Sequence, residues 1–286
     1  MVQLGNFWYL FFIVFTVLSI VGLYFLFRNK STMAKKILIA SLLLFNLALH
    51  FIKLLFPPYS TDKMFGIESA WFINICAVSV VSFPLIFFSK SDTLKDWMFY
   101  LGCISGGLAV LYPTEALDKS ILTLDLWRFY FCHIIILIAP LLTVLLKVHT
   151  LNYRNIWKMP FCMMGVLLFI MCNQVLQSEL GIVPLRGNDL FADHCGYRNN
   201  SLFWGPSDGL AEIFTWATPE FMKTIPVGEF AGQEKYWPVF YLFPACCVYF
   251  IVIPLLLCLP WEKGRIKEDF LKIITFFKGL KNRKKS

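Results

Sequence analysis

The sequence predicts an all-α membrane protein, a bundle of seven transmembrane helices whose amino terminus lies outside and whose carboxy terminus lies in the cytoplasm. The composition is the first reason: 58% of the 286 residues are hydrophobic and only 15% are charged, whereas soluble domains carry about 25% charged residues. The second reason is a series of apolar runs, most of them close to the ~20 residues that a membrane-spanning helix requires. The third is the concentration of lysine and arginine in alternate loops, which sets orientation.

The expected spans follow the apolar runs. They cover 7–27, 36–56, 68–88, 97–112, 126–147, 160–177 and 238–260. The first run has no basic residue before it and no small-residue cleavage site after it, so we expect a retained span rather than a signal peptide. We therefore expect one membrane domain over 1–262, including a long outer loop at 178–237, followed by a basic cytoplasmic tail at 263–286.

Charge in the loops predicts the orientation. The segments outside the spans are either basic or nearly neutral, and the basic ones are assigned to the cytoplasm. The loop at 89–96 has two lysines against two aspartates and does not help to decide the orientation. The basic positions are Arg28, Lys30, Lys35 and Lys36 in the first loop, Lys147, Arg154 and Lys158 in the fifth, and the tail from Lys263. The net charge of +8 is thus explained by residues that flank the membrane, and no nucleic-acid partner is predicted.

Two segments are not expected to span the membrane. The outer loop at 178–237 is rich in aromatics and predicts a lid over the membrane face, with short helices around 208–223. The tail has apolar residues at helical spacing, which predicts an amphipathic helix on anionic inner-leaflet lipids. These apolar residues are Ile266, Phe270, Ile273, Ile274 and Phe277.

Polar side chains fall at one depth in the predicted outer leaflet. His50, Cys76 and His133 each lie six to eight residues from the outer end of their span, which is about 9–12 Å at the helical rise per residue. Asn173 and Gln174 lie slightly shallower on the sixth span. Any one such residue is more often a packing or interhelical contact than a site, but a shared layer favours function.

A cysteine near a histidine suggests nucleophilic catalysis. The base removes the thiol proton, and the thiolate attacks an ester carbonyl to give a thioester. The layer therefore offers Cys76 as a nucleophile, with a nearby histidine of the same layer as its base. His50, Asn173, Gln174 and Tyr130, which shares the His133 helix face, are expected to bind substrate or to orient the reacting groups.

Other polar residues near the spans are assigned differently. Arg128 is expected to pair with Asp125 at the membrane surface, or to contact a lipid phosphate. Lys53 is expected to reach the outer surface. In a continuous helix over 68–88, Asn74 lies about 200° from Cys76, which favours packing for Asn74.

The outer loop carries a weaker candidate. Residues Asp193, His194 and Cys195 could bind a metal or supply a nucleophile, but three adjacent side chains do not easily face one ion. No metal site and no cofactor are therefore predicted.

Five short segments carry a resemblance to a known family: N-I-C-A-V at 74–78, G-L-A-V-L-Y-P at 107–113, Y-F-C-H-I-I-I-L-I-A-P at 130–140, V-L-Q-S-E-L-G at 175–181 and L-F-W-G-P at 202–206. With these segments the sequence resembles, over about 50–260, the YwaF-like integral membrane family, which is similar to the animal transmembrane protein 164 acyltransferase. The resemblance implies Cys76 as nucleophile and His133 as its partner. For the animal relative, it also implies transfer of phospholipid acyl chains through an acyl-cysteine intermediate.

Two other functions remain open at this point. A transporter of small molecules or lipids could line its path with the same polar residues, and a seven-helix sensor could bind a ligand under the outer loop. The almost uniformly apolar cytoplasmic halves of the spans and the lack of visible inverted repeats argue against the transporter. The enzyme is favoured mainly by the resemblance. The expected partners are membrane lipids, and the expected location is a cell membrane, with a bacterial plasma membrane assumed.

Overall fold

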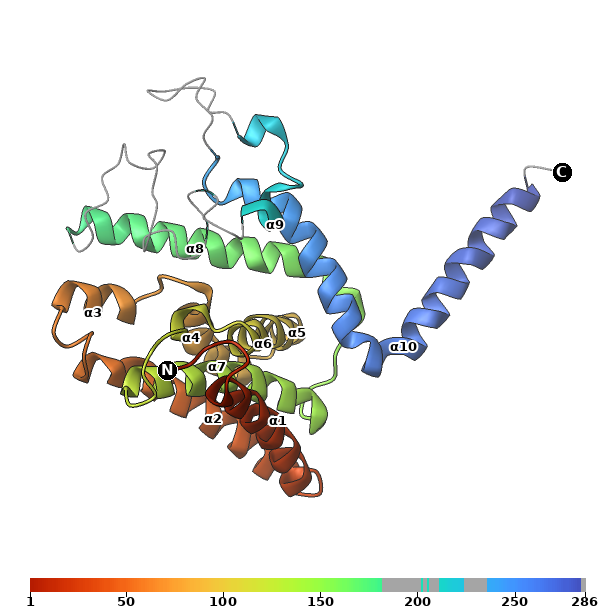
Figure 1. The fold of residues 1–286 in the computed structure, drawn as a ribbon. Coiled ribbons are helices and arrows are strands. Elements are labelled where there is room, and N and C mark those ends of the chain that lie inside the picture. The colour runs from red at the N-terminus through yellow and green to blue at the C-terminus, as the bar shows by residue number, and fades with distance from the viewer. Residues whose placement is uncertain (182–201, 203–204, 206–210, 224–235, 284–286) are drawn as a thin grey trace.

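The computed structural model describes residues 1–181, 202, 205, 211–223 and 236–283. Within these residues the fold is all-helical, as predicted, and no β-strand is present. The helices, shown in Figure 1, are α1 (Phe7–Phe27), α2 (Thr32–Ile52), α3 (Lys63–Ala70), α4 (Ile75–Phe88), α5 (Asp92–Leu101), α6 (Gly107–Leu111), α7 (Leu124–Leu145), α8 (Met159–Glu179), α9 (Ala211–Thr215) and α10 (Phe243–Arg283).

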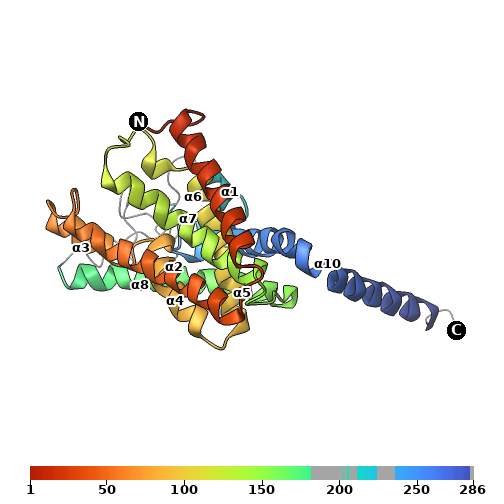
Figure 2. The same ribbon diagram turned by 90° about the horizontal axis from the view of Figure 1, so that it is seen from below.

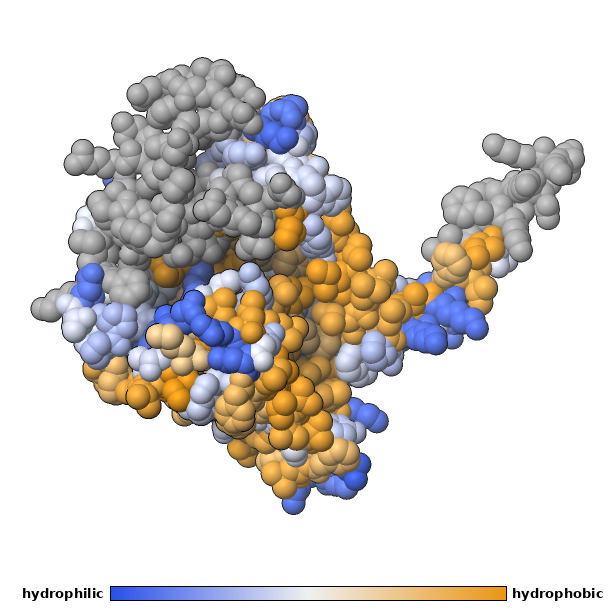
Figure 3. Space-filling view, in the orientation of Figure 1, coloured by the Kyte–Doolittle hydropathy of each residue, from blue (hydrophilic) through white to orange (hydrophobic). Residues whose placement is uncertain are grey.

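Five helical stretches in the described residues are long and apolar enough to cross a membrane. They cover Phe7–Phe27, Thr32–Leu55, Leu124–Leu145, Tyr153–Gln177 and Phe240–Lys272, and Ile75–Phe88 is a shorter apolar helix. The chain is therefore a multi-pass membrane protein. Figure 3 shows apolar side chains over the outward faces of α1 and α10, and Leu18 of α1 is 63% exposed, as expected for a surface in contact with lipid.

The predicted third span is not one helix. α3 ends at Ala70, the chain between 71 and 74 is not helical, and α4 begins at Ile75. Asn74 is the N-cap of α4: its backbone is extended and its side-chain oxygen accepts from the Ala77 amide at 2.8 Å. The expectation of a continuous helix over 68–88 is wrong, because this cap and contacts from other helices favour a new helix start here.

The predicted fourth span is helical but irregular. A π-helical segment, Gly102–Gly106, joins α5 to α6. A Cβ on Gly102 would lie 2.6 Å from the Ile136 carbonyl oxygen, and one on Gly106 would lie 2.9 Å from that of His133. The two glycines thus allow this segment to lie directly on the α7 backbone.

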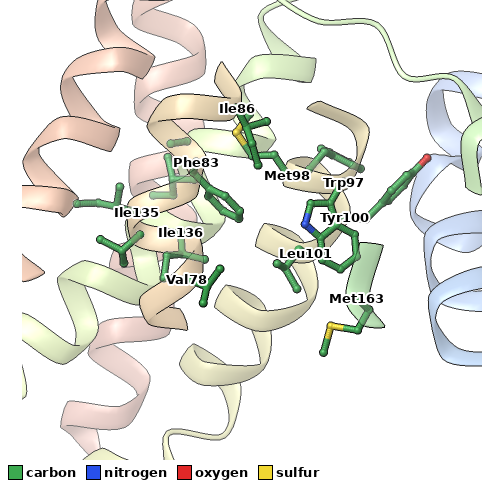
Figure 4. Close-up of a cluster of buried hydrophobic side chains, with 14 of the residues drawn as sticks. Val78, Phe83, Ile86, Trp97, Met98, Tyr100, Leu101, Ile135, Ile136 and Met163 are labelled. Carbon is green, nitrogen blue, oxygen red and sulfur yellow. The ribbon is translucent and has the colours of Figure 1, made fainter. Parts of the chain in front are cut away.

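α7 runs through the centre of the bundle and packs against α2, α4 and α5. Its middle turns are almost wholly buried, including Ile136 at 1% and Leu142 at 0% exposure. Figure 4 shows Ile135 and Ile136 of α7 meeting side chains of α4 and α5, among them Phe83 and Leu101. This packing fixes the position of α7 among α2, α4 and α5.

α10 continues beyond the predicted seventh span into the tail, so one helix crosses the expected boundary at 262. Pro254 and Pro260 lie within it, and proline removes a helical hydrogen bond and causes bends. Figure 1 shows the bend in α10, and Figures 1 and 2 show its second half leaving the bundle. Asp269 nevertheless anchors that half, since Arg154 donates to its Oδ2 from Nη2 at 2.7 Å.

Much of the predicted outer loop lies outside the described residues, including Asp193, His194 and Cys195. In the described part, α9 (Ala211–Thr215) and a 3-10 turn (Glu220–Met222) match the expected short helices. Trp216 Nε1 donates to the Tyr249 hydroxyl of α10 at 3.0 Å. The 211–223 segment therefore packs on α10.

Candidate functional site

A cavity of about 250 Å³ brings together residues from α2, α3, α4 and α7. His50, Cys76 and His133, which the sequence placed in one layer, all line it. The complete lining is His50, Lys53, Tyr59, Ser69, Ile73, Asn74, Cys76, Ala77, Val80, Glu115, Arg128, Phe129, Cys132, His133 and Ile136.

Cys76 lies in the first turn of α4, directly after the Asn74 cap. Its side chain is partly exposed to the cavity. The first backbone N–H groups of a helix have no partner within the helix, and they point toward its amino-terminal end. That end also carries a partial positive charge. A negative charge on the Cys76 sulfur or on an adjacent oxygen is therefore stabilised by the start of α4.

His133 is a buried residue of α7 with one ring nitrogen already engaged. Its Nδ1 lies 2.7 Å from the Phe129 carbonyl oxygen, one turn earlier. A carbonyl oxygen can only accept, so Nδ1 donates, and in the neutral imidazole Nε2 carries the lone pair. The hydrogen bond thus fixes the tautomer and leaves Nε2 able to accept a proton.

His50 and Lys53 of the second span hold the end of α3. His50 Nε2 donates to the Ala70 carbonyl at 3.0 Å, and Lys53 Nζ donates to the Ser69 carbonyl at 2.5 Å. The last carbonyls of a helix lack partners within the helix, so these donors satisfy them. They thereby fix the end of α3 at Ala70. Four residues, 71–74, separate this end from the first turn of α4, which carries Cys76.

Lys53 contradicts the prediction that it reaches the outer surface. It is only 7% exposed, and its ammonium lies 5.3 Å from the centre of the Tyr59 ring. The side chain turns inward because its ammonium group donates a hydrogen bond to the Ser69 carbonyl and makes a cation–π contact with the Tyr59 ring.

Arg128 anchors a polar cluster at the mouth of the cavity. Its Nη2 donates to Asp125 Oδ1 at 2.7 Å and to the Tyr59 hydroxyl at 2.9 Å. The Tyr59 hydroxyl donates to Asp125 Oδ1 at 3.0 Å. Burial raises the pKa of Tyr59 to about 12, so this hydroxyl keeps its proton at neutral pH. The predicted pairing of Arg128 with Asp125 is confirmed.

Three of the predicted residues do not line the cavity. Tyr130 is fully buried and stacks on Phe12 of α1, with ring centres 3.6 Å apart. Gln174 is buried in α8 at 2% exposure. Asn173, also in α8, lies 3.5 Å from the Phe72 carbonyl, so it contacts the non-helical segment before α4 rather than the cavity.

Several other residues line the cavity without having been predicted from the sequence. Lys53, Tyr59, Glu115 and Cys132 were not predicted to share a site with Cys76. The sequence did offer one signal for such a site: Lys53 and Arg128 are cations inside or beside apolar spans, where charged residues are costly and usually functional. Nothing in the sequence placed Glu115 here, because it lies in the loop between α6 and α7.

Asn74 was expected to face away from Cys76, and it lines the same cavity. The helical angle assumed for it does not apply, since it caps α4 rather than lying within it. Among the described residues, no group of three or more His, Cys, Asp and Glu side chains is arranged to hold a metal ion.

A sequence model of the TMEM164 family matches residues 2–203. The chain belongs to the TMEM164 family. The match covers α1 to α8, and with them Cys76 and His133; it begins before the resemblance noted in the sequence and ends before α9 and α10. No curated protein and no solved structure matches the chain.

Proposed function

We propose that this TMEM164-family protein transfers acyl chains of phospholipids through an acyl-cysteine intermediate. The observation that carries the proposal is the cavity that Cys76 and His133 share with Lys53 and Arg128. A nucleophile and a base occupy the same space as two cations that suit a lipid phosphate. The roles of the four residues are part of this proposal.

The first half-reaction acylates the protein. His133 Nε2 takes the Cys76 proton, and the sulfur attacks the ester carbonyl carbon of the donor. Backbone N–H groups at the start of α4 stabilise the oxyanion. As the tetrahedral intermediate collapses, the carbon–oxygen ester bond breaks and His133 returns the proton to the leaving alkoxide. The products are a Cys76 thioester and a lysophospholipid.

The second half-reaction releases the acyl chain. An acceptor hydroxyl, such as that of a lysophospholipid, gives its proton to His133 and attacks the thioester carbonyl. The carbon–sulfur bond breaks, and the proton returns to Cys76. One acyl group thus passes from the donor to the acceptor and the Cys76 thiol is restored. In each half-reaction His133 acts first as base and then as acid.

Cys132 is the alternative nucleophile, because it also lines the cavity and directly precedes His133. It lies in the interior of α7, where the backbone N–H groups are engaged in the helix, and it is only 4% exposed. Cys76 is more exposed than Cys132, and it lies in the first turn of α4. These differences favour Cys76.

We further propose the seven-span arrangement, with α3 and α4 together accounting for the third crossing and α5, the π-helical segment and α6 for the fourth. The basic loops then place the cavity in the outer leaflet and the tail at anionic lipids of the inner leaflet. Accessibility of single introduced cysteines to a membrane-impermeant reagent tests this orientation. Labelling at position 3 but not at position 30 in intact cells is expected.

Acyl transfer is tested on the purified full-length protein in vesicles that contain a phospholipid with a labelled acyl chain. We expect a hydroxylamine-sensitive acyl adduct, mapped to Cys76 by mass spectrometry and lost in Cys76→Ala. The matched controls are Cys132→Ala, inside the cavity, and Cys103→Ala, a partly exposed cysteine outside it. Both should keep the adduct; an unchanged adduct in Cys76→Ala contradicts the assignment.

A further inference from the structure

A second cavity, of about 290 Å³, lies against the first. The two share Lys53, Tyr59 and Arg128 in their linings. These side chains form a common wall, which we call the polar wall. One side of the polar wall faces Cys76 and His133, and the other faces the second cavity.

The polar wall is tightly connected. The Tyr59 ring lies between the two cations: Lys53 Nζ and the Arg128 guanidinium carbon are each 5.3 Å from its centre. The Tyr59 hydroxyl bonds both Arg128 and Asp125. The wall therefore holds two positive charges beside one aromatic ring.

Charge around the polar wall is not balanced. Asp125 binds both Arg128 and Lys119, at 2.7 and 3.0 Å. Lys53 has no carboxylate partner within the described residues, since its ammonium bonds the neutral Ser69 carbonyl. Counting Glu115 of the first cavity, three cations face two carboxylates, and one negative charge would neutralise the group.

Beyond the polar wall, the second cavity is an apolar groove between α2 and α7. Phe45, Leu49 and Ile52 of α2 face Trp127 and Phe131 of α7. The groove opens onto surface that a membrane covers: Phe45 is 53% and Ile52 45% exposed. Hydrocarbon chains of lipid are the apolar molecules present at such a surface.

We propose that the groove binds one acyl chain of the phospholipid substrate, whose phosphate is held by Lys53 and Arg128 at the polar wall. The lipid then lies across the wall, with its ester region on the Cys76 side. This arrangement rests on the proposed function and adds the binding mode of the donor. In this binding mode the groove, rather than the catalytic cavity, determines the selectivity for the length and unsaturation of the acyl chain.

The occupant follows from the two linings taken together. A neutral lipid would fill the groove but would leave the excess positive charge unneutralised, and a free phosphate would leave the groove empty. A fatty acid would supply a carboxylate, but it has no ester for the proposed attack by Cys76. A phospholipid satisfies both, with apolar burial for its chain and charge-assisted hydrogen bonds for its phosphate.

The test uses full-length Cys76→Ala protein in nanodiscs, so that no acyl transfer can occur. A phosphatidylcholine with a photoactivatable diazirine in one chain is added, and crosslinked peptides are mapped by mass spectrometry. Crosslinks are expected within 45–56, which covers the end of α2 and the residues directly after it, and within 124–131 of α7. Crosslinks spread evenly over the lipid-facing helices would overturn the proposal.

Two variants sharpen the test. Leu49→Trp fills the groove and should lower its crosslinking about tenfold, the change that about 1.4 kcal/mol of lost binding produces. The control Leu18→Trp changes a lipid-exposed residue of α1 and should leave groove crosslinking unchanged. Equal crosslinking in the two variants would overturn the groove assignment.

The role of the phosphate is tested separately. A diacylglycerol carrying the same diazirine chain should label the groove more weakly than the phospholipid, and Lys53→Gln should abolish that difference. Equal labelling by the two lipids in the Cys76→Ala protein that retains Lys53 would overturn the proposed phosphate contact. Because these readouts need no thiol, groove labelling without any Cys76 adduct would refute acyl transfer alone, and an adduct without groove labelling would refute this inference alone.

Discussion

His133 donates from Nδ1 to the carbonyl oxygen of Phe129, 2.7 Å away and one turn earlier on α7. This contact costs the helix little, because the Phe129 carbonyl has a second lone pair for its normal helical partner. It commits the opposite nitrogen, Nε2, to the role of acceptor. The first prediction follows from that tautomer.

His133→Gln should lower the rate of Cys76 acylation about 100- to 10,000-fold, the usual contribution of a general base. Glutamine keeps a polar side chain but cannot accept and return a proton at neutral pH. The rate is measured by the appearance of the labelled thioester. A normal rate, with the thioester still at Cys76, would remove His133 from the mechanism.

Asn74→Ala should slow acylation by disturbing the start of α4. Loss of an N-cap costs about 0.5–2 kcal/mol, and here the first turn carries the nucleophile. Asn6→Ala removes the equivalent cap of α1, where Asn6 accepts from the Tyr9 amide at 3.0 Å. Thermal melts should show similar losses for both variants, whereas only Asn74→Ala should slow the thioester. Equal acylation rates would contradict a link between this cap and the site.

Gly106→Ala should destabilise the protein and slow acylation, while Gly107→Ala should do neither. A Cβ at Gly106 would lie 2.7 Å from the Leu137 amide nitrogen and 2.9 Å from the His133 carbonyl oxygen, so the α7 backbone must move. Overpacking of this kind costs about 1–3 kcal/mol. No atom lies within 4 Å of the corresponding position at Gly107. Indistinguishable melting temperatures for the two variants would contradict the close approach of this segment to α7.

Asp96→Ala should destabilise the protein without touching the cavity. Asp96 is fully buried; His149 Nε2 lies 2.7 Å from its Oδ1, and Asn155 donates to its Oδ2 at 2.8 Å. Removing it leaves the buried His149 and the partly buried Asn155 without their acceptor, at about 1–3 kcal/mol for the buried group. Asp92→Ala is the control, since the Asp92 side chain is 77% exposed and should change stability by no more than about 0.5 kcal/mol. Unfolding in detergent, followed by circular dichroism, measures both.

The sequence predicted the helices well because length and apolarity are local properties. A run such as Phe7–Phe27 is helical in a bilayer whatever packs against it, because its backbone groups must be satisfied within the segment. The same reasoning failed at 71–74. There the chain leaves the helix because Asn74 caps α4, while His50 and Lys53 of another span satisfy the end of α3.

The site was predicted in part for the same reason. Depth along a span can be counted from the sequence, and it placed His50, Cys76 and His133 at one level. The direction in which a side chain points around a helix cannot be predicted from residue spacing when the helix has a break. Contacts between helices cannot be predicted from spacing either. Tyr130 therefore turned out to stack on Phe12 rather than to line the cavity. Cys132, which was not among the predicted site residues, lines it.

By itself, then, the sequence determined that this is a multi-pass helical membrane protein of a recognisable family, with a cysteine and two histidines at one depth. Only the tertiary structure decided that these three residues share a cavity with Lys53 and Arg128, and that an apolar groove lies behind the same two cations. The physical reason is that hydropathy depends on each segment alone. A cavity depends on where several helices stop, and those ends are fixed by hydrogen bonds between residues distant in the chain.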